Sequence, residues 1–197
     1  WLVLLPDGSK MTFGGTDDSV IKGPSSIVGA SSTIIEWMLS RVEDCNGNYA
    51  TIEYEKKNGR LYPETIFYTK NDGISLTERK IKFEYSNHLS PRISYDAGNR
   101  TDTTRYLSAV RTYYGYKEIF AYEFGYAADV RTGQYRLTTV QEKLKGQIYK
   151  QPVRISYRSA PDAAMLKPVT NVNTGGGTPD PGLCKVASNW CFVSQYS

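Results

Sequence analysis

Residues that could do chemistry are few in this chain and lie far apart in the sequence. His88 is the only histidine, so a catalytic triad or a multi-histidine metal site would need less usual partners. Its setting, Asn-His-Leu-Ser-Pro, is typical of an exposed loop. The oxygen donors that could serve a calcium ion are Asp17, Asp18, Asp44, Asn46 and Asn48. Their spacing lacks the downstream glutamate of an EF-hand. Asp and Asn also bond their own backbone in turns, so we interpret them as turn residues.

One pair of carboxylates has a spacing known from catalysis. Glu53 and Glu55 are separated by one residue, which on a strand places both side chains on one face. ADP-ribosyltransferases use an acid pair of this kind. Here the pair stands in an alternating strand directly after a turn, without an arginine and aromatic arrangement that would bind a nucleotide. We therefore nominate no catalytic residue and expect that this chain is not an enzyme.

Aromatic residues are the next candidates, because 16 tyrosines stand against six phenylalanines. A tyrosine ring packs on a sheet while its hydroxyl stays hydrated, which favours β-structure. Flat rings also stack on sugars, so Tyr113, Tyr114 and Tyr116 are a candidate aromatic binding surface. A second group shares one face of an expected strand and fits either a carbohydrate platform or, as we favour, the sheet core: Phe120, Tyr122, Phe124 and Tyr126.

Three cysteines argue against a disulfide framework, because one must remain unpaired and no C-x-x-C spacing is present. Cys45 lies in an expected turn. Cys184 and Cys191 are candidates for a disulfide in an oxidising compartment, although nothing in the sequence requires the pair.

Composition excludes several classes of function. The net charge of +4 comes from basic and acidic residues that are scattered without a run of like charge, so we expect no nucleic-acid partner. No stretch approaches the roughly 20 apolar residues of a membrane span. The glycines at 175–177 follow no strand-helix unit and match a linker better than a phosphate-binding loop. We expect no cofactor and no metal.

Apolar and polar residues alternate in short runs bounded by Gly, Asn, Asp and Pro, which predicts an all-β fold of antiparallel strands in successive hairpins. We expect nine or ten strands in a meander-like sheet or part of a β-shell. Corners are predicted at Pro6-Asp7-Gly8, Asn46-Gly47, 71–73 and Gly115, and residues 15–32 are predicted to form a loop. Ile81, Phe83 and Tyr85 should share the face opposite Lys80, Lys82 and Glu84.

The sequence divides into three parts. Residues 1–158 are predicted to form the antiparallel β domain, and residues 159–182 have the Pro/Gly-rich composition of a linker. Residues 183–197 are expected to be an irregular C-terminal tail or the start of a further module. The chain opens with Trp1 in what looks like a strand, so we expect it to be a piece of a longer protein.

Across about residues 1–158 the chain resembles the family of the Salmonella plasmid virulence B protein and the B components of insecticidal toxin complexes. The motif Asp44-Cys45-Asn46-Gly47-Asn48 before an aromatic strand is also similar to Rhs and YD-repeat proteins. The matching residues are Trp37, Asp44–Asn48, Ile52–Tyr54, Tyr62–Ile66, Tyr68–Thr69, Ile81–Tyr85, Pro91–Tyr95 and Arg136–Val140. The segment from Cys184 to Cys191 corresponds to nothing in that pattern.

The resemblance implies a β-rich region that precedes a β-propeller and a strand-built shell around a toxic polypeptide. Its ADP-ribosyltransferase, where present, is a separate C-terminal domain. We therefore expect a non-catalytic structural module of a secreted or surface-exposed bacterial toxin-delivery or Rhs-like protein, with other domains or subunits of a toxin complex as partners. The alternative is an adhesin or carbohydrate-binding module that uses exposed tyrosines.

Overall fold

The computed structural model describes residues 1–23, 33–96, 99–129 and 133–157, with the backbone alone at 88–90, 96 and 99. The predicted linker and tail, with Cys184, Cys191 and the glycines at 175–177, lie outside the described residues. The chain divides after Ile155, and the strands described below all lie in the first unit, Trp1–Ile155.

The first elements are β1 (Leu2–Leu4), β2 (Lys10–Phe13), the 3-10 turn η1 (Asp17–Ser19), β3 (Val20–Lys22), β4 (Ile34–Trp37), β5 (Leu39–Glu43) and β6 (Asn48–Lys57). They are followed by β7 (Arg60–Asn71), β8 (Arg79–Asp96), β9 (Asn99–Tyr114), β10 (Lys117–Ala128), β11 (Tyr135–Leu144), β12 (Gln147–Ile148) and β13 (Val153–Arg154).

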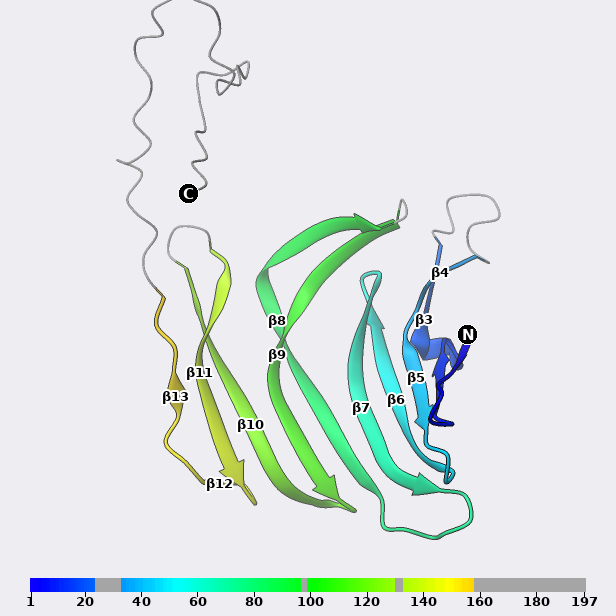
Figure 1. Ribbon diagram of the computed structural model, residues 1–197. Helices are drawn as coiled ribbons and strands as arrows, with labels where there is room; N and C mark the ends of the chain where they lie inside the picture. Colours follow the sequence, from blue (N-terminus) through cyan, green and yellow to red (C-terminus); the bar gives the residue numbers. More distant parts are fainter. Residues whose placement is uncertain (24–32, 97–98, 130–132, 158–197) are drawn as a thin grey trace, which may run out of the picture. The chain divides into compact units, whose positions relative to one another are not determined.

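Eleven of these strands form one antiparallel sheet (Figure 1). Its order is β1-β2-β5-β6-β7-β8-β9-β10-β11-β12, with β13 also paired to β11, while β3 and β4 form a separate two-stranded sheet. From β5 to β12 each strand pairs with its neighbour in the sequence. The predicted antiparallel all-β meander is therefore confirmed. Among the described residues, no helix is long and apolar enough to cross a membrane.

Glycine at the hairpin corners explains why the chain reverses where it does. Gly8, Gly47 and Gly115 have φ values of 85°, 77° and 58°, which side chains with a Cβ rarely adopt. They lie between β1 and β2, β5 and β6, and β9 and β10, as the sequence predicted. The Asn-Asp-Gly turn leads into a longer connection between β7 and β8, which covers residues 72–78.

The predicted loop over residues 15–32 is wrong for its described part, residues 15–23, and residues 24–32 lie outside the described residues. Thr16 caps η1: its N–H and its hydroxyl donate to the Ser19 hydroxyl oxygen at 3.1 and 2.9 Å. The chain then continues as β3, where Val20 and Ile21 are only 3% and 7% exposed. The short polar side chains of residues 16–19 led to the loop prediction, whereas in the structure they form η1 and its cap.

The run predicted as one strand over 33–44 is also interrupted. Its first part, β4, pairs with β3, and its second part, β5, pairs with β2 and β6. Between them the Met38 N–H donates to the Ser19 carbonyl and the Met38 carbonyl accepts from Gly14 N–H, each at 2.8 Å. These two bonds hold the strand at the junction of the two sheets.

The C-terminal run of the sheet is shorter than predicted. The expected strand over 148–158 is instead two two-residue strands, β12 and β13, on either side of Pro152. Proline has no N–H to donate to a ladder. With these divisions the described residues contain 13 strands, more than the nine or ten expected.

Strict alternation separates two chemically different faces of the main sheet. On one face an apolar row runs across six strands in direct register: Ile52, Ile66, Ile81, Thr112, Phe120 and Leu144. All six side chains are half-buried. The opposite face, one residue along, carries Lys82, Arg111 and Lys143. The predicted division of residues 80–85 between two faces is confirmed.

Pro63 marks where β8 separates from β7. The last pair of the β7–β8 ladder is Thr65 with Lys82, and Pro63, two residues further along β7, cannot donate to a partner strand. The Tyr85 hydroxyl donates to the Pro63 carbonyl at 2.8 Å instead. Burial, together with the neighbouring Tyr62, raises the pKa of Tyr85 to about 12. Beyond this point β8 and β9 bend together (Figure 1).

The bend lets the far part of β9 pack on the β6–β7 hairpin. Asp102 N–H donates to the Asn58 carbonyl at 2.9 Å, and a Cβ at Gly59 would lie 2.7 Å from the Arg100 carbonyl. Tyr62 is 8% exposed and stacks edge-on against Tyr85. A small core therefore forms here from residues far apart in the sequence.

Thr69 in β7 has a φ of 58°, which a β-branched residue adopts only under strain. It lies in a bulge where the β6–β7 register shifts between Tyr49 and Thr51. Replacing Thr69 by Gly should raise the free energy of unfolding by about 1 kcal/mol, because relief of strain exceeds the entropy lost. Urea denaturation measures the change.

The matched control is Thr51→Gly, in the adjacent strand and without a positive φ. This change should lower the free energy of unfolding by about 1 kcal/mol, because glycine weakens a regular strand. Equal losses in both variants would show that Thr69 is not strained.

Candidate functional site

An ion-pair ladder crosses β8 to β11 on the charged face. The Arg111 guanidinium donates to Glu84 at 3.1 Å, to Glu118 at 3.2 Å and to Glu123 at 3.1 Å. Lys143 adds a further ion pair with Glu123 at 2.8 Å. Five charged side chains from four strands thus form one network.

Small residues make this ladder geometrically possible. Ala109 lies in register between Glu84 and Glu123, and Ala121 lies between Arg111 and Lys143. Their methyl groups leave room for the long charged side chains to meet diagonally above them. As a result Ala109 is 3% exposed and Ala121 is 0% exposed. The network covers these alanines and replaces an apolar core on this face.

The network favours its charged state. Burial by itself would lower the pKa of Arg111, but the hydrogen bonds to Glu84 and Glu123 outweigh it and raise that pKa. The pKa of Glu123 is lowered, chiefly by the hydrogen bond from Lys143 and in spite of burial. The charged forms of Arg111 and Glu123 are therefore stabilised by their neighbours.

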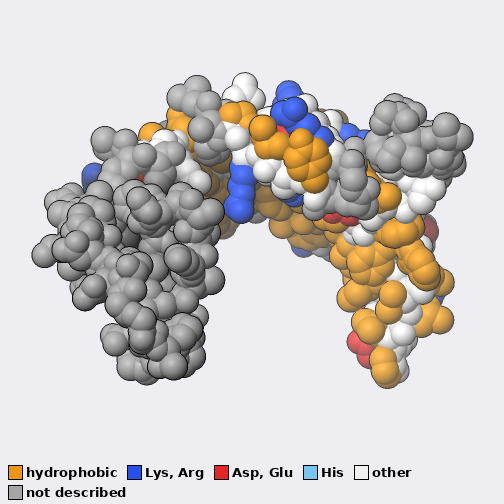
Figure 2. Space-filling model, turned by 90° about the horizontal axis from the view of Figure 1, so that it is seen from above, with side chains coloured by type: hydrophobic (Ala, Val, Ile, Leu, Met, Phe, Trp, Pro, Cys, Tyr) orange, Lys and Arg blue, Asp and Glu red, His pale blue; other side chains and the backbone are white. Residues whose placement is uncertain are grey.

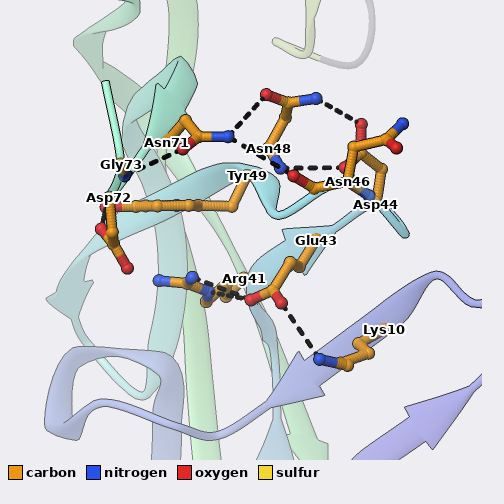
Figure 3. Close-up of polar contacts among 10 residues, drawn as sticks. All are labelled: Lys10, Arg41, Glu43, Asp44, Asn46, Asn48, Tyr49, Asn71, Asp72 and Gly73. Atoms are coloured by element: carbon orange, nitrogen blue, oxygen red, sulfur yellow. Dashed lines mark hydrogen bonds and ion pairs between the residues drawn. The ribbon is translucent and has the colours of Figure 1, made fainter. Parts of the chain in front are cut away.

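A second polar network joins two hairpin corners (Figure 3). Asp44 Oδ1 accepts from the backbone N–H groups of Asn46 and Asn48, and Asp44 Oδ2 accepts from the Asn48 side chain, each at 2.8 Å. Asn48 Oδ1 in turn accepts from Asn71 Nδ2 at 3.0 Å, and Asn71 Oδ1 accepts from Gly73 N–H at 2.9 Å. The β5–β6 corner is thereby linked to the start of the β7–β8 connection.

The β5–β6 corner is linked to the charged face of the sheet by the ring of Tyr49, on which Arg41 stacks. The Arg41 guanidinium lies 3.6 Å from the centre of the Tyr49 ring and pairs with Glu43 at 2.8 Å. Glu43 also pairs with Lys10 at 3.1 Å, and the bonds from Arg41 and then Lys10 lower its pKa. The Tyr49 hydroxyl donates to Asp72 at 2.8 Å, which raises the pKa of Tyr49. These contacts join β2, β5 and β6 to Asp72 in the β7–β8 connection (Figure 3).

Three of the five candidate calcium ligands, Asp18, Asp44 and Asn48, accept hydrogen bonds from the protein itself through side-chain oxygens. Both Asp44 oxygens accept bonds from the turn, which lower the Asp44 pKa, the Asn48 side chain contributing most. Asp18 Oδ2 accepts from the Tyr54 backbone N–H at 2.8 Å. Within the described residues, no three or more His, Cys, Asp or Glu side chains are placed to hold a metal ion. The cluster acts as turn chemistry, in line with our interpretation of the sequence.

The predicted aromatic surface lies at the β9–β10 corner. Tyr113 is half-buried, with Lys80 Nζ at 5.8 Å from its ring centre. Tyr114 is 47% exposed and Tyr116 is 101% exposed. The second aromatic group lies on β10 and includes Phe120 of the apolar row. Tyr122 is 40% exposed, whereas Phe120, Phe124 and Tyr126 are half-buried.

The remaining candidates from the sequence, Glu53, Glu55, His88 and Cys45, do not form a common site among the described residues. Glu55 pairs with Arg105 of β9, whereas Glu53 is exposed and lines a hollow with Asp18 and Glu64. The backbone of His88 belongs to β8 and not to a loop, and its side chain is outside the described residues. Cys45 is exposed in the β5–β6 corner.

Sequence reasoning missed the exposed apolar residues at the first edge of the sheet. Figure 2 shows hydrophobic side chains gathered over the N-terminal strands. The most exposed are Trp1, Leu2 and Leu4, at 75%, 61% and 66%. β1 is an edge strand, and the run Leu-Val-Leu contains no charge or proline to protect an edge. The uncharged Leu-Val-Leu run was the signal in the sequence that could have indicated this exposed edge.

No protein-family profile and no characterised protein sequence matches the chain. Solved structures do match its fold. The TcdB2-TccC3 structure superposes with a TM-score of 0.63 at 14% identity, covering 80% of this chain and 10% of that one. The Photorhabdus luminescens Tc holotoxin pore gives 0.61 at 15% identity, with 80% and 10% covered. The N-terminal domain of the effector SpvB from Salmonella typhimurium strain LT2 gives 0.61 at 12% identity, with 73% and 60% covered.

The chain shares its fold with these toxin proteins. The resemblance to the virulence-protein and toxin-complex family, inferred from short motifs, is thus confirmed at the level of the fold. The chain corresponds to about a tenth of the TcdB2-TccC3 chain.

Removing the centre of the ladder should weaken the sheet. Arg111→Gln leaves Glu84, Glu118 and Glu123 without their shared cation, so we expect a loss of about 2 kcal/mol in the free energy of unfolding. That is less than the roughly 3–5 kcal/mol for fully buried pairs, because these groups stay partly hydrated. Urea denaturation measures it. Arg100→Gln is the control, because the Arg100 side chain is 58% exposed and, among the described residues, forms its ion pair with Asp102 alone. If both variants unfold alike, the ladder is not a stabilising network.

Asp44 should make the corner sensitive to acid. Because its folded pKa is lowered, its contribution to stability is present above the unfolded pKa and is lost as the pH falls through the folded pKa. We expect Asp44→Ala to lower the urea midpoint at neutral pH and the difference from wild type to disappear at about pH 2. Asn46→Ala is the control, since only the backbone of Asn46 bonds to Asp44. A difference that persists in acid would contradict an ionic corner.

Proposed function

We propose that this chain is a non-catalytic structural module of a bacterial toxin-delivery or Rhs-like protein. It contributes its sheet to a larger β-shell or to a surface on which another domain or subunit docks. Such a protein is secreted or displayed at the bacterial surface, and the partners of the module are other parts of a toxin complex.

The observation that carries this proposal is the half-buried apolar row. Ile52, Ile66 and Ile81 continue through Thr112 into Phe120 and Leu144, across six paired strands. A sheet face of this composition is stabilised by covering it with a second layer. The described strands leave these side chains partly accessible, so the face is suited to pack against a further part of a larger assembly.

The fold likeness supports the same reading. A match that covers most of this chain but only 10% of the TcdB2-TccC3 chain fits a module within a much larger protein. The absence of a catalytic role is part of the proposal. It is supported by the engagement of the Asp44 corner and of Glu55 in bonds within the protein.

A second function is favoured by the exposed rings at the β9–β10 corner. Tyr114 and Tyr116 are 47% and 101% exposed, and exposed rings can stack on sugars. An adhesin or carbohydrate-binding module would use them directly. The two proposals differ in which surface becomes covered: the apolar row in one, the tyrosine corner in the other.

Hydroxyl-radical footprinting of this chain alone and of its intact parent protein distinguishes them. We expect oxidation of Phe120, Tyr122 and Phe124 to fall severalfold in the parent protein, because a second layer would exclude solvent there. Tyr113 on the opposite face is the internal control. The parent gene should also encode propeller or YD repeats downstream.

The opposite result is equally specific. Unchanged oxidation of the apolar row, with glycan-array binding that Tyr116→Ala abolishes, would replace the structural module by the adhesin. Tyr95→Ala, which removes a ring 69% exposed on β8, is the matched control for the array.

A further inference from the structure

A hollow with three lysines lies between β3 and the β6–β7 corner. It has a volume of about 510 Å³ and is lined by Lys22 of β3, by Lys56, Lys57, Asn58 and Gly59, and by Asp17, Val20 and Ile21. The lysines come from two segments more than 30 residues apart in the sequence, which only the fold brings together. No motif in the sequence indicates this site.

The lysines of the hollow differ from several other cations of the chain. Lys10, Arg41 and Arg100 each have a carboxylate partner, at 3.1, 2.8 and 2.9 Å. In the part of the chain that the structure describes, the side chains of Lys22, Lys56 and Lys57 make no hydrogen bond or ion pair. The residues that line the hollow thus include three lysines and a single acidic residue, Asp17.

The backbone beneath these lysines is firmly held. Val20 and Ile21 are 3% and 7% exposed and form the floor. The turn at Asn58 and Gly59 is fixed by the bond from Asp102 N–H to the Asn58 carbonyl at 2.9 Å. Like charges held together on a rigid backbone repel one another. An anion that binds between them removes that repulsion without any rearrangement.

We propose that this hollow binds the phosphate group of a small ligand. The three lysines and one aspartate among the lining residues carry an excess of two positive charges, and a phosphate monoester carries about −1.5 to −2 at pH 7. Lysine binds phosphate as a point charge. The volume falls within the range of about 300–1,000 Å³ of small-molecule sites. The site is independent of the proposed structural role, because it lies away from the apolar row.

Titration of the full chain with inorganic phosphate, followed by amide NMR shifts, tests the site. We expect saturable shifts at residues 20–22 and 56–59. In Lys22→Gln/Lys56→Gln/Lys57→Gln the apparent affinity should fall about tenfold or more, the effect of losing several charged contacts. The control is Lys117→Gln/Lys145→Gln, which removes the two lysines of another hollow and should leave the affinity unchanged.

Thermal unfolding gives an independent readout that is insensitive to the choice of NMR reporter. At constant ionic strength, phosphate should raise the Tm above that in chloride for wild type and for the control, but no longer for the triple variant. Equal stabilisation of all three proteins would be a general salt effect and would overturn the proposal. Shifts spread over the whole surface, without saturation, would overturn it as well.

Discussion

Pairing between strands that are adjacent in the sequence is the constraint on which the rest of the structure depends. From β5 to β12 each strand pairs with the next strand in the sequence, so the register of each hairpin determines which side chains share a face. Direct register produces the apolar row from Ile52 to Leu144 and, one residue along, the ladder around Arg111. Both faces thus follow from the same set of backbone hydrogen bonds.

Much of the fold could be predicted because its signals are local. Alternation in residues 80–85 and the glycines at positive φ, such as Gly47 and Gly115, act within one hairpin. One error occurred where distant residues decide. The break at Met38 depends on bonds to Gly14 and Ser19, and no local pattern reports the pairing of β4 with β3.

The candidate sites were less predictable for the same reason. The Asp44 corner was interpreted correctly as a turn, because its bonds reach only a few residues along the chain. The Arg111 ladder depends on the register of four strands, and the lysine hollow depends on β3 meeting the β6–β7 corner. Spacing in a sequence indicates neither. The two alanines beneath the ladder, Ala109 and Ala121, are ordinary until their register is known.

The meander also determines how the sheet can be assembled in time. Because each strand from β6 onward needs only the strand before it, the sheet can grow by one hairpin after another, and little loop-closure entropy is lost at each step. A polypeptide that emerges from a channel with its N-terminus first can thus fold progressively, without waiting for its last residues. The contact between β9 and the β6–β7 hairpin differs from the hairpins, because it joins residues some 40 positions apart, Tyr62 and Thr104.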